Sequence, residues 1–430
     1  SQPISICCDF AASTLNNFFC KIMRTIENWI KIALMNLCLV ALLGVTLRYK
    51  IAFSLPFIDQ KNLLHGHSHF AFSGWISQAL MALLLYYLLK QGQANVLKRY
   101  RIILFSNLLT AYGMLISFPI QGYAFFSILF STLSIFISYV FAIMYWKDLN
   151  KLKGIRNPHP WFKAALLFNA ISSIGPFSLA YMMAAQIINQ KLYLASMYYF
   201  LHFQYNGWFL FICLGLFIYK LTEFIGEKKG FKSIFWLFAM SCVPSYFLSV
   251  LWLPISTTMY ILIIFSVIMQ LIGWIWLINI VRIHLSAINH HLSKPAKWLL
   301  SLSAFSMTIK LVLQLGSTHP TLSHLAFGFR PIVIGYIHLV LLGIITIFIL
   351  GFIVSEKLIS IQKSVMSGIV IFVSGIFINE VLLMMQGGLA LMTISVSHMN
   401  VYLFLAAIIM FSGISIILLN NKNPSHQTPK

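Results

Sequence analysis

The chain has 430 residues, of which 60% are hydrophobic and only 9% are charged, and its formal net charge is +21. A soluble globular domain carries about 25% charged residues, so the composition excludes a soluble enzyme and indicates a membrane protein that is one bundle of helices. The basic residues lie in short loops between apolar runs, and the sequence therefore does not predict nucleic acid as a partner.

Twelve apolar runs follow one another along the chain. A membrane-crossing helix needs about 20 apolar residues, and the fold class that follows is an all-α bundle of twelve transmembrane helices. We predict an N-terminal segment at 1–27, a transmembrane domain at 28–419 and a C-terminal tail at 420–430. The predicted spans are 28–48, 66–89, 102–119, 124–146, 162–188, 194–219, 233–253, 257–281, 298–316, 331–354, 365–388 and 395–419.

The charge pattern supports this topology independently, because cytoplasmic loops collect Lys and Arg. If both termini are cytoplasmic, 23 of the 29 basic residues fall in inner segments. The pattern therefore predicts an integral protein of a bacterial inner membrane with both ends in the cytoplasm. The outer segments hold only Arg48, Lys50, Lys61, Lys191 and Arg330.

Three histidines lie within five residues at the start of the second span, at His65, His67 and His69. Ionisable residues at membrane depth are costly and usually functional, and a neutral imidazole is a common ligand of haem iron. His65 and His69 are four residues apart and share a helix face, whereas His67 points nearly the other way. Either His65 or His69 is therefore the predicted ligand.

A histidine on the tenth span matches His69 in depth. His69 lies eight residues after Lys61, and His338 lies eight residues after Arg330. At about 1.5 Å per residue, both imidazoles lie roughly 12 Å below the outer basic residue. Since both helices enter from the outer side, the two rings can serve as the axial ligands of one haem.

Neighbouring residues fit this interpretation. Gly74 and Gly343 each follow a candidate ligand by five residues, and a missing side chain there would let a flat macrocycle approach. Arg330 is placed to bind a haem propionate, a role that suits the forked donors of arginine. The alternative is that the histidines of the second span cap the helix and bond interfacial water.

Further polar residues lie inside other spans. His202, with Gln204 and Asn206 close by in the sixth span, is either a metal ligand or a packed, hydrogen-bonded residue. Lys310 and Glu380 are charges within apolar runs, and they either pair with each other or serve a proton path, because an unpaired charge in hydrocarbon is costly.

These features resemble a known family. Twelve spans with histidines on the second, sixth and tenth are similar to the catalytic subunit of haem-copper oxidases and nitric oxide reductases. The stretch 332–343 resembles the helix 10 motif of the nitric oxide reductase branch. The resemblance implies that His338 is one axial ligand of a low-spin haem, that the other lies within 65–69, and that His202 is the helix 6 metal ligand.

The chain departs from that family at the second metal centre. The position of the high-spin haem ligand is Tyr336, whose phenolate can bind haem iron, and the run 236–245 lacks the helix 7 histidine pair. Asn206 stands where the family has an acidic residue or tyrosine. His202 alone does not hold copper with useful affinity, because copper sites recruit two or three nitrogen or sulfur ligands. A dismantled reducing centre without copper is therefore expected.

The sequence thus predicts a b-type haem protein that transfers electrons through a bis-histidine, low-spin haem. Its expected partners are membrane lipid and a redox donor, either quinol or an outer-face cytochrome, with partner subunits as a further option. One alternative is an active, divergent terminal oxidase or nitric oxide reductase, in which Tyr336 or another group binds a second haem. Another is a haem-free transporter or assembly factor, with Lys310 and Glu380 on a proton or metal-ion path.

Overall fold

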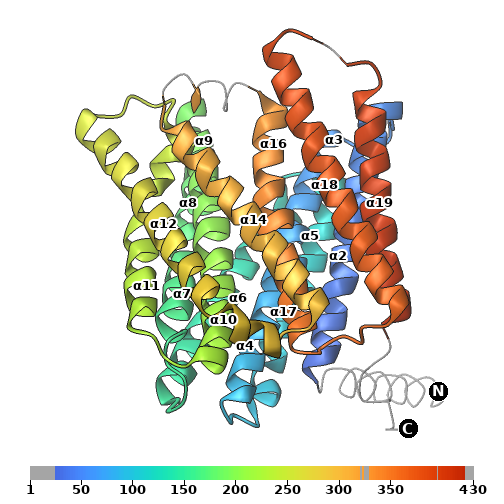
Figure 1. Cartoon of the computed structure of the whole chain (residues 1–430). Helices are drawn as coiled ribbons and strands as arrows, with labels where there is room; N and C mark the ends of the chain where they lie inside the picture. Colours follow the sequence, from blue (N-terminus) through green and yellow to red (C-terminus); the bar gives the residue numbers. More distant parts are fainter. Residues whose placement is uncertain (1–24, 320–321, 324–328, 395, 422–430) are drawn as a thin grey trace, which may run out of the picture.

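The chain is an all-helical membrane bundle. The computed structural model describes residues 25–319, 322–323, 329–394 and 396–421, and these form helices without strands (Figure 1). Eleven of the described helices are long and apolar enough to cross a membrane, and a bent pair makes a twelfth crossing if it is one span. The predicted all-α membrane bundle is confirmed. The predicted segments 1–27 and 420–430 lie almost entirely outside the described residues.

Each predicted span corresponds to one helix or to a run of consecutive helices. The run 233–253 is the bent pair, where the axis turns by 42° at Pro244 because proline lacks the N–H that continues a helix. The helices are α2 (Ile26–Phe53), α3 (Gln60–Phe70), η1 (Ala71–Ser77), α4 (Gln78–Lys90), α5 (Val96–Gln121), α6 (Phe125–Lys151), α7 (His159–Ser172), α8 (Ile174–Ala184), α9 (Gln190–His202), η2 (Phe203–Phe209), α10 (Leu210–Ile225), α11 (Lys229–Cys242), η3 (Pro244–Val250), α12 (Thr257–Ile283), α13 (Leu285–His291), α14 (Lys294–Ser317), α16 (Arg330–His338), η4 (Leu339–Thr346), α17 (Ile347–Ser355), α18 (Lys363–Leu391) and α19 (Met399–Asn420).

Polar residues fix where several helices begin. The side chain of Asp59 accepts the backbone N–H of Asn62 at 2.8 Å and caps α3. Asn189 caps α9 through Leu192 in the same way, at 3.1 Å. Such caps satisfy donors that the first helical turn leaves without a partner. The two caps therefore set the starting points of two of the three spans that carry the histidines.

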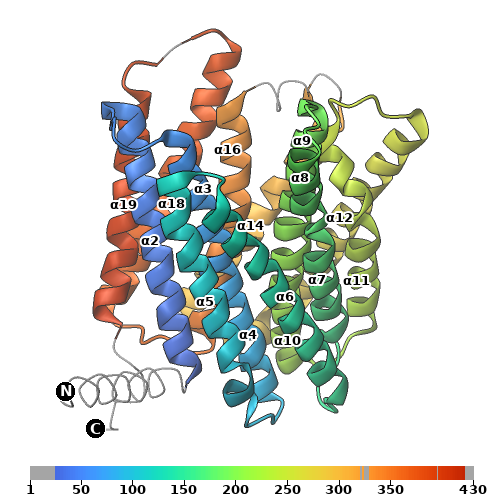
Figure 2. The same ribbon diagram turned by 180° about the vertical axis from the view of Figure 1, so that it is seen from behind.

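Three spans form the centre of the bundle, and they are the three that carry His65–His69, His202 and His338. Each consists of an α-helix, a π-turn and a second α-helix: α3–η1–α4, α9–η2–α10 and α16–η4–α17. Of their most apolar stretch, 89%, 72% and 78% is buried, against 11–50% in the other spans. Figures 1 and 2 show α3, α9 and α16 toward one end of the bundle and α4, α10 and α17 toward the other.

The closest helix pair lies at one edge of the bundle, where α18 runs beside α19 (Figures 1 and 2). A Cβ atom added at Gly375 would come within 2.8 Å of the backbone nitrogen of Met410, and one at Gly368 within 2.9 Å of the carbonyl oxygen of Gly413. Small residues let membrane helices approach in this way, and the approach maximises dispersion contacts between them. The glycines of α18 therefore have different roles that depend on the face they occupy.

We expect Gly375→Ala to lower the free energy of unfolding by about 1–3 kcal/mol, because the new methyl group overpacks the contact with Met410. Gly388→Ala is the matched control on the same helix, since no atom lies within 4 Å of its Cβ position. It should be neutral or stabilising by up to about 1 kcal/mol, the intrinsic helix preference of alanine. Denaturant titration in detergent measures both values, and equal effects would contradict the packing role.

Candidate functional site

In each central span, the α-helix changes to a π-turn at or just after a histidine. His202 is the last residue of α9 and His338 the last of α16, while η1 begins two residues after His69. π-helical turns are rare, and they occur mostly as single turns at functional sites. Their recurrence in three separate spans marks the middle of the bundle as the place to look for function.

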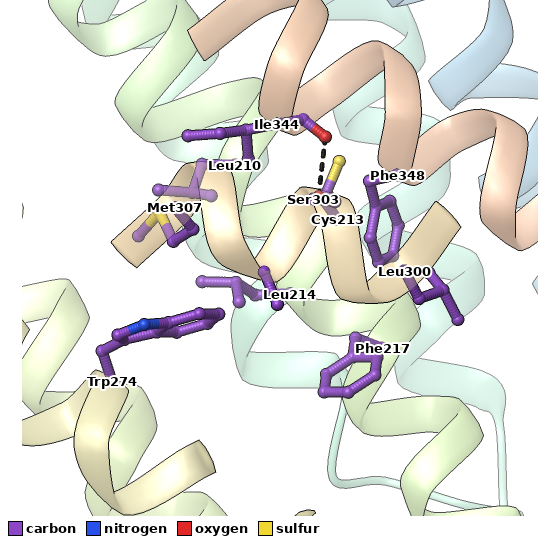
Figure 3. A pocket seen from close by; sticks show the side chains of 11 residues that line it. Leu210, Cys213, Leu214, Phe217, Trp274, Leu300, Ser303, Met307, Ile344 and Phe348 are labelled. Carbon is purple, nitrogen blue, oxygen red and sulfur yellow. Dashed lines mark hydrogen bonds between the residues drawn. The ribbon is translucent and has the colours of Figure 1, made fainter. Parts of the chain in front are cut away.

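Neighbouring helices hydrogen-bond to the carbonyl groups of the π-turns. Asparagine or serine side chains on α2, α5 and α14 supply the donors, so buried carbonyl groups at the π-turns are satisfied. Figure 3 shows one of these bonds, from Ser303 to Ile344, at the edge of an apolar cleft. The three bonds are Asn36 Nδ2 to Gly74 O (2.6 Å), Asn107 Nδ2 to Ser73 O (3.1 Å) and Ser303 Oγ to Ile344 O (2.9 Å).

The cleft in Figure 3 does not contain the candidate ligands. It has a volume of about 50 Å³ and lies between α10, α12, α14 and the tenth span. Its lining includes Trp274 and Phe348, and among the residues around it the only polar side chains are a thiol, an indole N–H and a hydroxyl. Since Ser303 and Trp274 already donate within the protein, the cleft offers little chemistry of its own.

A direct hydrogen bond joins the second and tenth spans. Nε1 of Trp75 in η1 donates to Oγ1 of Thr346 in η4 at 3.0 Å, and both residues are buried. His67 lies eight residues before Trp75, and His338 lies eight residues before Thr346. Both segments consist of the same kinds of helix, so the two histidines lie at about the same depth. The sequence predicted this match for His69, which lies two residues further along the chain, and for His69 it stays a prediction.

The imidazoles of His67 and His338 interact electrostatically with each other, and Arg48 of α2 interacts with both. The ring of His67 also lies against α2, where a Cβ atom at Gly44 would be 3.6 Å from its Cε1. Among the described residues, Nδ1 of each histidine is buried without a hydrogen-bond partner. A buried polar atom of this kind is costly unless a ligand or water completes it.

His65 and His69 face a different helix. The ring of His69 stacks on Phe118 of α5 at 4.3 Å, and its Nε2 lies 3.2 Å from the hydroxyl of Tyr123. The ring of His65 packs edge-on against Tyr123 at 4.7 Å. Burial raises the pKa of Tyr123 to about 12, so the phenol keeps its proton at neutral pH. Its hydroxyl group can therefore donate a hydrogen bond to His69. The structure thus brings His67, rather than His65 or His69, toward His338, and the ligand role of the other two stays a prediction.

The two glycines near the candidate ligands contact side chains of the chain itself. A Cβ atom at Gly74 would come within 2.6 Å of the ring of Phe70, and one at Gly343 within 3.1 Å of Oγ of Ser306. Each missing side chain therefore makes room for a neighbouring residue. The expectation that these glycines open a path for a macrocycle has no support in this packing.

Charged residues gather near the start of α16. Arg48 interacts electrostatically with Glu380 of α18 and with Arg330, which is exposed at the first position of α16. Glu380 also accepts a hydrogen bond from the side chain of Asn379 at 3.1 Å. Arg48 thus contributes a second cation beside Arg330, which the sequence interpretation missed. Its signal was available, because Arg48 belongs to the small set of basic residues in outer segments.

Tyr336 lies half-buried on α16, one turn before η4, and it interacts electrostatically with Tyr205 of η2. It stands two residues before His338 and therefore points to another face of the helix. Its neighbour is the sixth span rather than the second. The suggestion that Tyr336 binds a second haem stays a prediction.

His202 has partners at both ring nitrogens. Its Nε2 lies 2.9 Å from the carbonyl oxygen of Cys242, and its Nδ1 lies 3.1 Å from the side-chain nitrogen of Asn206. The ring is 1% exposed. A neutral imidazole that donates from Nε2 and accepts at Nδ1 satisfies both bonds. This geometry matches the packed, hydrogen-bonded interpretation of His202 better than a free metal ligand.

Lys310 and Glu380 do not form a pair among the described residues, whose ion pairs involve other groups. Lys310 is 1% exposed and interacts electrostatically with His202 and with the buried Cys242. Glu380 faces Arg48 instead. The two charges therefore belong to separate surroundings, one near the sixth span and one near the start of the tenth.

The residues present fit a group that needs two axial nitrogen ligands. The side chains of His67 and His338 are only partly buried. They lie on α3 and α16, which have few buried residues, whereas nearly all residues of α4 and α17 are buried. No cluster of three or more His, Cys, Asp or Glu side chains in the described part of the chain can hold a bare metal ion. A haem needs only two protein ligands, since its porphyrin supplies the others.

Similarity to known proteins does not identify this chain. Comparison with protein-family models gives no match, and comparison with curated proteins gives none either.

Proposed function

We propose that this chain is an integral membrane b-type haem protein in which His67 and His338 are the axial ligands of one low-spin haem. The observation that carries the proposal is the hydrogen bond from Trp75 to Thr346, which joins the two spans eight residues beyond His67 and eight residues beyond His338. Each has a ring nitrogen without a partner among the described residues. The scaffold we propose is that of the haem-copper oxidase and nitric oxide reductase catalytic subunits.

The surrounding residues have roles that suit this cofactor. Arg48 and Arg330 place two cations near the start of α16 against the single carboxyl group of Glu380, and a haem propionate would supply a second acidic group there. Arginine suits this role because its fork of donors matches a carboxylate. Phe70 fills the space beside Gly74 and keeps the helix closely packed below the histidine.

Bis-histidine binding favours electron transfer. A haem held by two imidazoles supplies one-electron chemistry and has no open axial position for a gas molecule. We propose membrane quinol or a cytochrome at the outer face as the electron donor, with the chain in a bacterial inner membrane and both termini in the cytoplasm. Because His202 has both nitrogens engaged, a second, gas-reducing metal centre is the less supported alternative.

The haem-free transporter receives less support than the haem protein. A proton or ion path through Lys310 and Glu380 requires the two residues to be connected, and they face different groups. Each residue instead interacts with its own neighbours, Cys242 for Lys310 and Arg48 for Glu380. The candidate ligands, by contrast, come together from spans far apart in the sequence.

The absorption spectrum of the purified full chain tests the proposal. Protein produced with a sufficient haem supply should show a b-type α band after dithionite reduction and one haem per chain by pyridine haemochrome. The oxidised form should give the electron paramagnetic resonance signal of a low-spin, bis-imidazole ferric haem. A colourless preparation with full helical circular dichroism would overturn the proposal, and two haems per chain would favour the divergent reductase instead.

A further inference from the structure

The three π-turns are joined by hydrogen bonds from two buried indoles. Trp75 of η1 donates to Thr346 of η4 at 3.0 Å, and Trp208 of η2 donates to Ser77 at the end of η1 at 3.3 Å. Both tryptophans are 1% exposed. An indole N–H is a donor only, and a buried donor needs its acceptor. The π-turns therefore form one connected belt across the middle of the bundle.

The position of η1 determines which histidine faces the tenth span. A π-turn contains one more residue than an α-turn, and one residue of an α-helix turns by about 100°. Residues before η1 are thus rotated by about that angle from where an uninterrupted helix would place them. His67 faces α2 and His338 in this setting, while His65 and His69 face α5.

Contacts on three sides hold η1 where it is. Asn36 of α2 donates to Gly74 O at 2.6 Å, and Asn107 of α5 donates to Ser73 O at 3.1 Å. On the third side is the bond from Trp75 to Thr346, which alone of the three reaches another ligand-bearing span. It connects the rotational setting of the second span to that of the tenth.

We infer, on the basis of the proposed function, that Trp75 and Thr346 are positioning residues whose hydrogen bond sets the mutual orientation of the His67 and His338 rings. Neither residue is a ligand. Each lies eight residues beyond its histidine, within the π-turn of its span. Loss of the bond frees the two spans to rotate independently, and the angle between the imidazole planes changes with them.

The chain offers a matched control for this bond. Nε1 of Trp274 in α12 donates to Oγ1 of Thr308 in α14, also at 3.0 Å, and neither helix bears a candidate ligand. Trp75→Phe and Thr346→Val remove the first bond, while Trp274→Phe and Thr308→Val remove the second. All four variants keep an aromatic ring or an isosteric side chain in place. Thr346→Ser, which keeps the hydroxyl group, serves as the rescue variant.

The first readout is the paramagnetic resonance spectrum of the ferric haem, whose largest g value depends on the angle between the axial imidazole planes. Trp75→Phe and Thr346→Val should shift this g value alike, and the double variant should shift it no further, as expected when two residues act through one bond. Thr346→Ser, Trp274→Phe and Thr308→Val should keep the wild-type spectrum. Unchanged g values in both Trp75→Phe and Thr346→Val would overturn the inference.

The second readout does not need haem and separates this inference from the proposed function. A chain with His67→Cys and His338→Cys is treated with a short bis-maleimide, and the linked peptides are quantified by mass spectrometry. Adding Trp75→Phe or Thr346→Val should lower the linked fraction at least twofold, whereas Trp274→Phe should not.

An unchanged linked fraction in these variants contradicts the positioning role. If the wild-type chain binds no haem while Trp75→Phe or Thr346→Val still lowers the linked fraction of the Cys pair, the proposed function is refuted and the positioning role is kept. If Trp75→Phe does not fold, the comparison of Thr346→Val with Thr346→Ser decides.

Discussion

His338→Ala and His67→Ala are each expected to abolish the b-type absorption of the purified chain. Each change removes one of the two proposed axial ligands, and each of these histidines has a buried ring nitrogen without a hydrogen-bond partner among the described residues. Even residues that only support a metal ligand change affinity by about 10–100-fold, so loss of the ligand should exceed that. Haem titration of the purified apo-protein, followed by the α band, measures the loss.

His65→Ala and His69→Ala are the controls from the same five-residue stretch. Their rings pack on Phe118 of α5 and on Tyr123, which follows α5, and their removal should leave the haem content within about twofold of wild type. Loss of haem in His69→Ala with retention in His67→Ala would restore the ligand predicted from sequence. Retention in all four variants, His338→Ala included, would exclude the second and tenth spans as the haem site.

Much of the fold follows directly from the sequence. Runs of about 20 apolar residues in a chain with 9% charged residues leave no alternative to membrane helices, because backbone groups in lipid must bond within the segment. Each predicted span corresponds to a helix, or in one case to a bent pair. The central position of the histidine-bearing spans agrees with the expectation that polar residues inside a membrane avoid lipid.

The orientation of the individual histidines did not follow from the sequence. The helix-face argument separated His67 from His65 and His69, but the preference for His69 came from its depth, which does not say which neighbouring helix each face meets. The π-turn η1 changes the faces of the helix, and its contacts with Asn36 and Asn107 come from helices that periodicity alone does not bring together. Pairing of Lys310 with Glu380 failed for a similar reason, since it depends on which distant spans are neighbours.

The far ends of the same three spans are held by a buried ionic network. Nζ of Lys220 at the end of α10 lies 2.5 Å from Oε1 of Glu356 and 3.0 Å from Oε2 of Glu223. Tyr86 of α4 donates to Oε2 of Glu356 at 2.6 Å. The Lys220 and Glu356 side chains are only 14% and 7% exposed. This Lys220 network thus joins α4, α10 and the end of α17, on the opposite side of the π-turns from His67.

Lys220→Met is expected to lower the free energy of unfolding by about 3–5 kcal/mol, because it leaves the buried carboxylate of Glu356 without its cation. Lys151→Met is the matched control: Lys151 is 68% exposed, pairs with Asp148 at 3.5 Å and leaves Arg99 in place at 2.6 Å. Its loss should change stability by less than about 1 kcal/mol. Denaturant titration in detergent, followed by helical circular dichroism, gives both values.

The stability of the double variant Lys220→Met with Glu356→Gln shows why Lys220→Met is destabilising. The cause is either the lost attraction between the two residues or the buried carboxylate that is left without a cation. If the cost of Lys220→Met comes mainly from the uncompensated carboxylate, neutralising Glu356 should recover part of the stability, and the double variant should be more stable than Lys220→Met alone. Additive losses would show instead that each residue contributes separately through packing. Because the network fixes α4, α10 and α17 at the ends remote from the histidines, it gives the π-turn belt a rigid base, and the setting of His67 and His338 depends on that base remaining folded.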